Sequence, residues 1–283
     1  MHLWQLLVLA VLGACAASPE TDCPALLAGP LLPDAGPCRI TPGAVQCDAA
    51  TFMVDGGGQR REVTVALPRG DAPDAGWPTV IAYQGSFLPA GGFFSASAAT
   101  PFGGYQEALT VAALLGSGFA VIAPNTEVGQ TFWLTNVPPW SVEWSGCPDD
   151  LFLGGLFAAV DAGALGPLDG RRLFAMGISS GGYMTSRMAV SYAGRFRALA
   201  IASASYATCA GAACVVPPLP ADHPPTLFLH GLLDTAVPVA TMEQYRSALK
   251  AHGRKTCEIL DRSAGHQWLD EAPLAVPSWF AGQ

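Results

Sequence analysis

The sequence predicts a single-domain α/β fold, in which a mostly parallel central sheet lies between layers of helices. Apolar segments that read as strands alternate along the chain with segments of helical character, and this alternation is typical of parallel sheets with helical crossovers. A chain of 283 residues with 51% hydrophobic content can bury one large core, so no second domain is required. We expect this domain to cover residues 24–283.

The strands expected along this domain are short and rich in aliphatic residues. They cover residues 63–67, 79–83, 119–124, 172–176, 198–202, 225–231 and 255–261. Helical segments are expected at residues 106–115, 151–162 and 239–252. Gly56, Gly57 and Gly58 read as a hairpin or loop, because no helix start follows them to make a phosphate-binding turn.

The most informative segment is the turn Gly177-Ile178-Ser179-Ser180-Gly181, which joins the strand at 172–176 to a following helix. A Gly-x-Ser-x-Gly turn between a strand and a helix is the nucleophile elbow of an α/β-hydrolase. Its serine sits in a strained backbone conformation that exposes the hydroxyl, so the residues packed against it must lack a Cβ. Five such residues also occur in ordinary glycine turns, and the context decides between the two interpretations.

The context is the chain order of the acid and the base, which in this fold follow the serine in loops after later strands. Asp234 follows the strand at 225–231, and His266 follows the strand at 255–261. We expect Ser179 to attack an acyl carbon, His266 to take and return its proton, and Asp234 to fix the imidazole tautomer. The remaining histidines and the other nearby acids do not lie where this chain order requires the base or the acid. They are His2, His223, His230, His252, Asp149, Asp150, Asp222, Asp261 and Asp270.

Two backbone N–H groups are expected to form the oxyanion hole. One belongs to the residue after the nucleophile, here Ser180, and the other to the loop after the strand at 79–83. Within the turn Gln84-Gly85-Ser86-Phe87 the sequence favours the N–H of Ser86. The alternative is an ordinary turn at Gly85 with no role in catalysis.

Charge and motifs exclude several other classes of function. The net charge is −8 and only two of the fourteen basic residues are lysines, which argues against nucleic acid as a partner. The sequence has no zinc spacing, P-loop or dinucleotide fingerprint, so we expect neither a metal nor a cofactor. The mean hydropathy of +0.33 reflects either a bias toward alanine, glycine and proline or an apolar surface for a water-insoluble substrate.

Residues 1–17 read as a secretion signal, because their apolar segment at 3–12 is too short to span a bilayer and small residues follow it. The sequence Leu12-Gly13-Ala14-Cys15 resembles a lipobox, which would make a lipidated Cys15 the first mature residue and attach the protein to a membrane. Ordinary cleavage after Ala16 or Ala17 is the alternative. Both predict a location outside the cytoplasm, secreted or lipid-anchored in the cell envelope.

Seven further cysteines fit an oxidising compartment, and we expect disulfides among them. Cys209 and Cys214 bracket a small loop, and the three cysteines at 23, 38 and 47 are close enough to pair locally. Because seven is odd, one thiol should stay free, and Cys257 is expected to be that thiol.

The elbow Gly177-Ile178-Ser179-Ser180-Gly181, the leader and one catalytic domain without an appended binding domain resemble the extracellular medium-chain-length poly(3-hydroxyalkanoate) depolymerases. The resemblance covers nearly the whole mature chain. It implies a secreted serine esterase that cuts a bacterial storage polyester, with Ser179, Asp234 and His266 in the triad positions. Polyhydroxybutyrate depolymerases and feruloyl or acetylxylan esterases share this scaffold and stay open as alternatives. A binding lipoprotein that has lost catalysis is the alternative from a different class.

Two aromatic segments, at 87–105 and 131–144, follow strand ends where this fold places its binding loops. We expect Phe87, Phe93, Phe94, Trp140 and Trp144 in these segments to contact the substrate. In the absence of a separate adsorption domain, these loops would have to contact polymer themselves. Packing over the core is the alternative interpretation of these side chains.

Overall fold

The computed structural model describes residues 20–28, 35–210 and 213–283. Fourteen strands are present in this part of the chain: β1 (Glu20–Thr21), β2 (Cys38–Thr41), β3 (Ala44–Cys47), β4 (Ala50–Gly56), β5 (Gln59–Ala66), β6 (Trp77–Tyr83), β7 (Ser95–Ser97), β8 (Ala120–Pro124), β9 (Leu168–Ile178), β10 (Phe196–Ala202), β11 (Cys209–Ala210), β12 (Ala213–Cys214), β13 (Thr226–Gly231) and β14 (Thr256–Asp261). The helices are α1 (Gly104–Gly116), α2 (Pro148–Asp161), α3 (Ser180–Ser191), α4 (Val239–Ala251) and α5 (Ala272–Ala281), with short 3-10 turns η1 (Pro24–Leu27), η2 (Ala90–Phe93), η3 (Pro101–Gly103) and η4 (Leu134–Asn136).

Nine strands form one central sheet in the order β1-β14-β13-β10-β9-β6-β8-β5-β4. The six strands from β14 to β8 are parallel, while β4 and β5 form an antiparallel hairpin at one edge and β1 pairs antiparallel with β14 at the other. Smaller sheets are formed by β2-β3-β7 and by β11-β12. The expected mostly parallel α/β sheet is confirmed, and every strand expected from the sequence is present.

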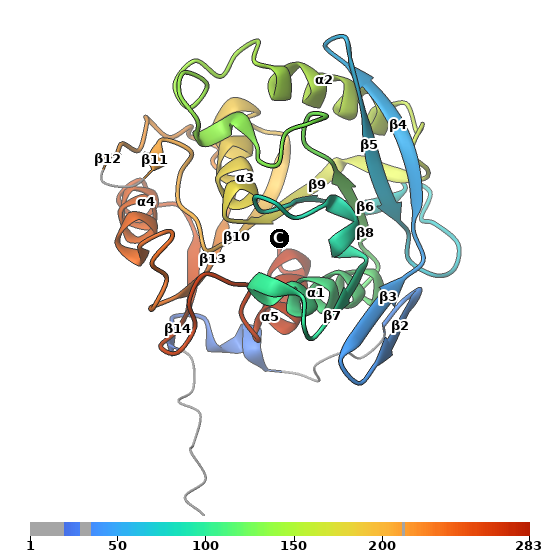
Figure 1. Cartoon of the computed structure of the whole chain (residues 1–283), viewed down its shortest axis with the longest axis horizontal. Coiled ribbons are helices and arrows are strands. Elements are labelled where there is room, and N and C mark those ends of the chain that lie inside the picture. Colours follow the sequence, from blue (N-terminus) through green and yellow to red (C-terminus); the bar gives the residue numbers. More distant parts are fainter. Residues whose placement is uncertain (1–19, 29–34, 211–212) are drawn as a thin grey trace, which may run out of the picture.

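Helices cover both faces of this sheet. Figure 1 shows α1 and α5 on one face and α2, α3 and α4 on the other. The side chains of β13 show why: Leu227 and Leu229 enter the core beneath α1 and α5, whereas Phe228 enters the core beneath α4. All six residues of β13 are buried, as expected for a parallel strand covered on both sides. None of the described helices is long and apolar enough to cross a membrane.

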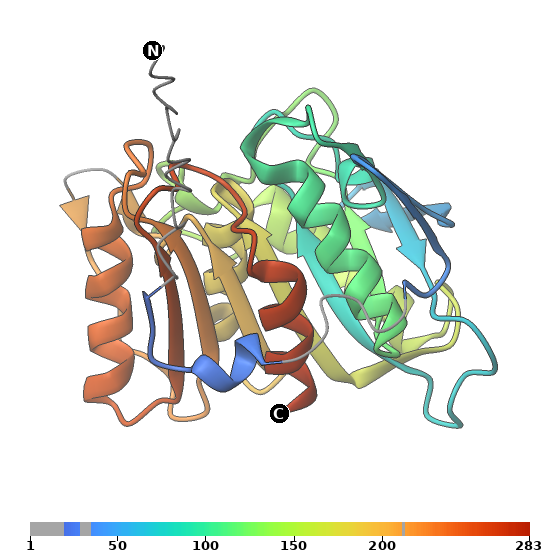
Figure 2. The same cartoon turned by 90° about the horizontal axis from the view of Figure 1, so that it is seen from below.

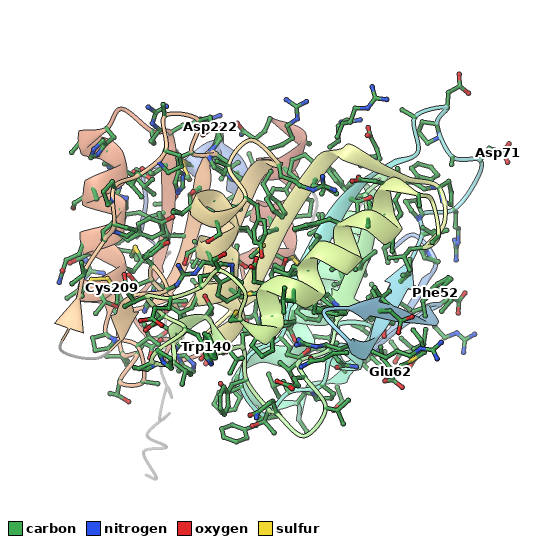
Figure 3. The ribbon with its side chains drawn as sticks, turned by 90° about the horizontal axis from the view of Figure 1, so that it is seen from above. Phe52, Glu62, Asp71, Trp140, Cys209 and Asp222 are labelled. Carbon is green, nitrogen blue, oxygen red and sulfur yellow. A yellow bond between two sulfur atoms is a disulfide. The ribbon has the colours of Figure 1, made fainter. Side chains whose placement is uncertain are left out.

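The carboxyl ends of the parallel strands lie on the same side of the molecule, and the loops that follow these strands gather there. The segments after β13 and β14 and the segment that precedes α1 lie at the upper edge of the molecule in Figure 2. Asp222, one of the acids excluded on its position in the sequence, lies at the opposite side of the molecule from the loop of Trp140 (Figure 3). The fold therefore brings the loops expected to carry the triad together at the carboxyl ends of the parallel strands.

Two of the three disulfides are local, as expected, and the third joins distant segments. Cys23 pairs with Cys257, Cys38 with Cys47, and Cys209 with Cys214. Cys257 is therefore not the free thiol, and that expectation is wrong. The free thiol in the described part of the chain is the buried Cys147 at the start of α2. The strand of Cys257 is buried as expected, but the segment of Cys23 runs alongside it through the pairing of β1 with β14.

Candidate active site

The turn at Ser179 has the geometry of a nucleophile elbow. Ser179 lies between β9 and α3 with φ 54° and ψ −122°, outside the regions that L-residues favour. A Cβ at Gly177 would lie 2.7 Å from the carbonyl oxygen of Tyr83, and one at Gly181 would collide with the same carbonyl. Glycine at both positions thus lets the strained turn pack against the end of β6. The Ser179 side chain is half-buried, and its hydroxyl makes no hydrogen bond to any residue that the structure describes.

Asp234 and His266, from the loops after β13 and β14, form a hydrogen-bonded pair. His266 Nδ1 lies 2.8 Å from Asp234 Oδ2. The other oxygen, Oδ1, accepts hydrogen bonds from the backbone N–H groups of Ala236 at 2.9 Å and Val237 at 2.8 Å. Burial opposes ionisation of Asp234, but the bonds to His266 and Val237 outweigh it and hold the pKa of the carboxyl below its ordinary value. The acid is thus held as a carboxylate that fixes the imidazole.

His230, excluded on its position in the sequence, also reaches the acid. Its Nε2 lies 2.9 Å from the carbonyl oxygen of Val237 and 3.4 Å from Asp234 Oδ2. Burial lowers the pKa of His230, against the opposing effects of Val237 and Asp234, so the ring is neutral at pH 7. The Nε2–H group of this neutral ring donates to the Val237 carbonyl and lies beside the carboxylate as a fourth N–H group, in addition to those of His266, Ala236 and Val237. The spacing of four residues across the strand end is the signal that could have identified this contact.

The loop expected to supply one oxyanion donor packs directly against the elbow. A Cβ at Gly181 would approach the carbonyl oxygen of Gln84 to 2.6 Å, so this loop and the start of α3 are in contact. Phe87 N–H donates to the Thr131 carbonyl at 2.7 Å, whereas the N–H of Ser86 has no acceptor among the described residues. The N–H of Ser180 belongs to the first turn of α3, where helix amides have no partner within the helix. Both expected donors are thus free of hydrogen-bond acceptors among the described residues, and their role in catalysis stays a prediction.

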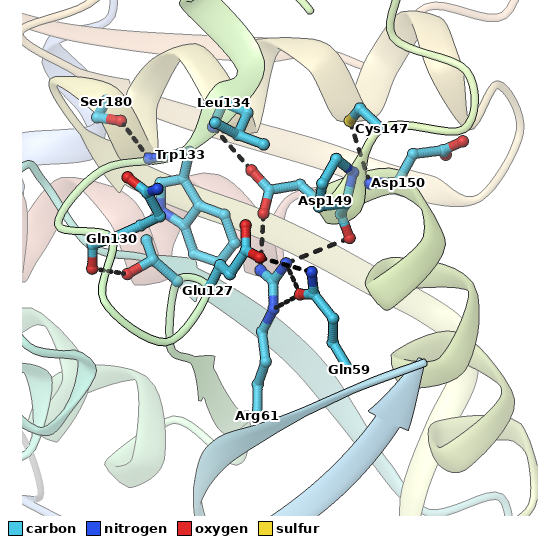
Figure 4. A network of polar contacts seen from close by, with 12 residues as sticks. Gln59, Arg61, Glu127, Gln130, Trp133, Leu134, Cys147, Asp149, Asp150 and Ser180 are labelled. Atoms are coloured by element: carbon cyan, nitrogen blue, oxygen red, sulfur yellow. Dashed lines mark hydrogen bonds and ion pairs between the residues drawn. The ribbon is translucent and has the colours of Figure 1, made fainter. Parts of the chain in front are cut away.

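The Ser180 side chain makes a contact that the sequence does not predict. Its hydroxyl accepts a hydrogen bond from the backbone N–H of Trp133 at 2.9 Å, and the Trp133 indole donates to the Gln84 carbonyl at 3.1 Å. Asp149 continues this network, because it accepts from Leu134 N–H at 2.7 Å and from Arg61 at 2.7 Å (Figure 4). Asp149 is thus a fully buried partner of Arg61 that holds the segment after Trp133 against the elbow.

The aromatic side chains expected to contact the substrate differ in exposure. Phe87 is largely exposed and Trp140 is half-buried, whereas Phe93 and Phe94 lie in the hydrophobic core. Trp144 is also buried. The expectation that Phe93, Phe94 and Trp144 line the substrate surface is therefore wrong for this conformation.

The reason for this burial is the path of the chain. The turn η2 packs against α1 and β8, and the Phe94 carbonyl after it accepts a hydrogen bond from the N–H of Cys47 in β3 at 2.8 Å. The Trp144 indole donates to the Tyr192 hydroxyl at 3.2 Å beneath the guanidinium of Arg187. Packing, the alternative that the sequence left open, explains these rings.

A cavity of about 450 Å³ lies beside the loop after β6. It is lined by Gln84 and Phe87 from this loop, by β4 and β5 residues, and by residues 125–131. No member of the Ser179, Asp234 and His266 set lines it. The Oε1 atom of Gln84 is buried without a hydrogen-bond partner in the described structure.

Comparison with known proteins agrees with this geometry. No family model matches the chain. A poly(3-hydroxyoctanoate) depolymerase from Pseudomonas fluorescens is 47% identical over 244 residues, which are 85% of this chain and 87% of that protein.

Solved structures with a similar fold include an S-formylglutathione hydrolase from Staphylococcus aureus, with a TM-score of 0.55 at 13% identity over 82% of this chain and 99% of that one. An esterase from Pyrobaculum calidifontis matches with a TM-score of 0.51 at 15% identity over 84% of this chain and 85% of the other. At these identities the likeness shows the fold alone. The sequence identity to the Pseudomonas protein, across most of both chains, shows more: this chain is a carboxylic ester hydrolase of the α/β-hydrolase fold and belongs to the family of that poly(3-hydroxyoctanoate) depolymerase.

Proposed function

We propose that this protein is a secreted serine esterase that hydrolyses the ester bonds of poly(3-hydroxyalkanoate) with medium-length side chains. The observation that carries the proposal is the 2.8 Å bond between Asp234 and His266, in the loops where an elbow serine at Ser179 requires them. The 47% identity to a poly(3-hydroxyoctanoate) depolymerase supports the choice of polymer.

The proposed reaction has two halves. Ser179 Oγ attacks the ester carbonyl while His266 Nε2 takes its proton, and the N–H groups of Ser86 and Ser180 stabilise the oxyanion of the tetrahedral intermediate. This intermediate collapses to an acyl-enzyme, and His266 returns the proton to the departing hydroxyl of the shortened polymer. Water, deprotonated by His266, then attacks the acyl-enzyme and releases the carboxylic acid and a free Ser179. The Asp234 carboxylate stabilises the imidazolium in both halves.

Substrate preference is tested by comparing polymers that differ in side-chain length. Each methylene that an apolar surface removes from water is worth about 0.8 kcal/mol, so we expect poly(3-hydroxyoctanoate) to be hydrolysed faster than poly(3-hydroxybutyrate). Release of soluble hydroxy acids from the two suspensions by the purified enzyme measures this difference. Hydrolysis of polyhydroxybutyrate alone, or of feruloylated or acetylated sugars alone, would assign the enzyme to the alternative substrates. If the purified protein hydrolyses none of these esters, the result would favour the alternative of a binding lipoprotein that has lost catalysis.

Secretion is supported by the three disulfides, which persist in oxidising compartments. Residues 1–17 and Cys15 lie outside the described residues. A lipobox at residues 12–15 predicts a mature protein that begins at a lipidated Cys15 and partitions with membranes, and Cys15→Ser should block this processing. Mass spectrometry of the mature N-terminus checks it, and an unmodified start at Ala16, Ala17 or Ser18 would contradict anchoring.

A further inference from the structure

We propose that three exposed apolar side chains around Ser179, those of Phe87, Phe102 and Leu233, form the surface by which the enzyme adsorbs to water-insoluble aliphatic polyester. We call these three residues the apolar rim. The proposal rests on the proposed function, because it names where the polymer contacts the same site.

Each rim residue is adjacent to a different functional group of the site. Phe87 directly follows Ser86 in the loop that packs on the elbow, and Leu233 directly precedes Asp234. The Phe102 ring meets the His266 ring edge to face, with centroids 6.0 Å apart. The backbone N–H of Leu233 donates to the Ala264 carbonyl at 3.0 Å, two residues before His266. The rim thus comes from three separate loops that meet at one site.

The exposure of these side chains is high for their size. Phe87 is 78% exposed, Leu233 is 61% exposed and Phe102 is 47% exposed. Single exposed apolar residues are ordinary on protein surfaces, but several that gather at one place mark a site of contact with another molecule. Here they gather at the residues expected to carry the chemistry.

Two of the three rim residues are also held in strained backbone conformations. Phe87 has φ 66° and Phe102 has φ 57°, and in the described chain only Ser179 and Ser203 share this feature among residues other than glycine. A bulky residue with positive φ costs free energy and persists only where its surroundings fix it, most often at functional sites.

The surroundings that fix these two residues are neighbouring loops of the site. The Phe87 N–H is bonded to the Thr131 carbonyl, and the Phe102 carbonyl accepts from Trp268 N–H at 2.9 Å. A Cβ at Gly103 would collide with the Trp268 carbonyl, so the turn after Phe102 is also packed closely. These contacts fix the backbone at both residues while both side chains stay exposed. The strain indicates that the placement of these two side chains, and not merely their apolar character, serves the site.

The chemistry of the partner follows from charge and position. No rim residue is charged, and the protein carries a net charge of −8, which disfavours an anionic membrane surface. A polymer that covers the rim also covers Ser179, so adsorption delivers ester groups to the nucleophile. An uncharged polyester with aliphatic side chains offers both the apolar surface and the ester.

Adsorption can be measured separately from hydrolysis in a Ser179→Ala background. The test variant carries Phe87→Asn, Phe102→Asn and Leu233→Gln, since asparagine tolerates positive φ and glutamine keeps the size of leucine. The matched control is Leu151→Gln, because Leu151 is 46% exposed and packs beside the Gly57 turn of the β4–β5 hairpin. Depletion of each protein from solution by emulsified poly(3-hydroxyoctanoate) gives its affinity. We expect at least tenfold weaker adsorption for the test variant and a change within twofold for the control.

Equal adsorption of the test variant and its parent would overturn the proposal, as would rim-dependent binding to phosphatidylcholine vesicles without binding to polymer. If thermal melting shows that the triple variant is unfolded, the three single variants provide the same comparison. In active enzyme, the rim substitutions should lower polymer hydrolysis more than p-nitrophenyl acetate hydrolysis; an equal loss would contradict a role in adsorption. Adsorption without any polymer hydrolysis by the wild-type enzyme refutes the proposed function but leaves the rim supported.

Discussion

Asp234 shows how much of the chemistry depends on the surroundings of one side chain. Its Oδ1 accepts two backbone N–H bonds from the turn that follows it, and its Oδ2 faces both His266 and His230. These contacts hold the carboxylate in place beside Nδ1 of His266. The residue order along the chain predicts the pair but not the second histidine, because the contact of His230 depends on the three-dimensional path of the turn.

Asp234→Asn should abolish most of the activity while leaving the protein folded. The amide cannot accept the Nδ1 proton in the same way and misorients the imidazole, so we expect kcat for a soluble nitrophenyl ester to fall roughly 10⁴-fold. Asp149→Asn is the matched control, since Asp149 pairs with the buried Arg61 and should affect stability by about 3–5 kcal/mol instead. A larger loss of kcat from Asp149→Asn than from Asp234→Asn would mean that the acid has been assigned wrongly.

Glu107 gives the stability of the protein a predictable pH dependence. It is buried in the first turn of α1, where it accepts a hydrogen bond from the Trp268 indole at 2.7 Å, and burial raises its pKa from 4.5 to about 8. Between these values the unfolded chain loses the Glu107 proton while the folded protein keeps it. The contribution of Glu107 to stability is therefore complete below pH 4.5 and is lost progressively as the pH rises to about 8.

Glu107→Gln should remove this decrease, because the amide keeps the oxygen that accepts from Trp268 and does not titrate. Chemical denaturation of both proteins from pH 4 to 9 measures the difference. We expect the variant to gain stability relative to the parent as the pH rises. Parallel stability profiles for the two proteins would show that Glu107 is already ionised in the folded state.

The aromatic residues mark the limit of residue-level prediction. Exposure of Phe93 and Phe94 cannot be read from a Gly/Ala/Ser-rich sequence, because it depends on how η2 folds back onto the core. Phe87 is exposed, and its contact with substrate stays a prediction.

At the scale of elements, the buried parallel strands are predicted most reliably, because short continuous apolar runs between turns are typical of strands covered on both faces. The strand at β9 is predicted at 172–176 and extends over Leu168–Ile178. Helix α5 is not predicted, since Pro277 lies inside it and its ten residues have no regular polar face. Its place beside α1 is decided by the core that the two helices share. The pairings of β1 with β14 and of β7 with β3 join segments that are distant in the sequence, which local sequence does not encode.

The disulfide between Cys23 and Cys257 joins elements at the two ends of the described chain. Its sequence separation is 234 residues, against 5 for the bond between Cys209 and Cys214. In the chain-entropy account a crosslink that closes a longer loop stabilises more, so replacing Cys23 and Cys257 by alanine should lower the free energy of unfolding by about 2–4 kcal/mol. The same change at Cys209 and Cys214 should cost less. Urea unfolding of both variants under oxidising conditions tests this order, which a larger loss at the short loop would reverse.

In the whole molecule, every group that the proposed chemistry needs lies in the loops at the carboxyl ends of the parallel strands. Parallel strands place Ser179, Asp234 and His266 at their carboxyl ends, and the topology alone predicts this meeting from the sequence. The apolar rim comes from loops of the same site. Composition predicts the class of partner only coarsely: the acidic charge argues against nucleic acid, and it does not identify which ester is bound.

Labelling with a fluorophosphonate shows directly whether Ser179 is the nucleophile. The reagent phosphonylates a serine activated by a histidine, so peptide mapping by mass spectrometry identifies the residue attacked. We predict one adduct per chain, on Ser179, with loss of ester hydrolysis in proportion to labelling, and no adduct in Ser179→Ala. Full ester hydrolysis by Ser179→Ala, or an adduct on a different serine that tracks the loss of activity, would show that Ser179 is not the nucleophile.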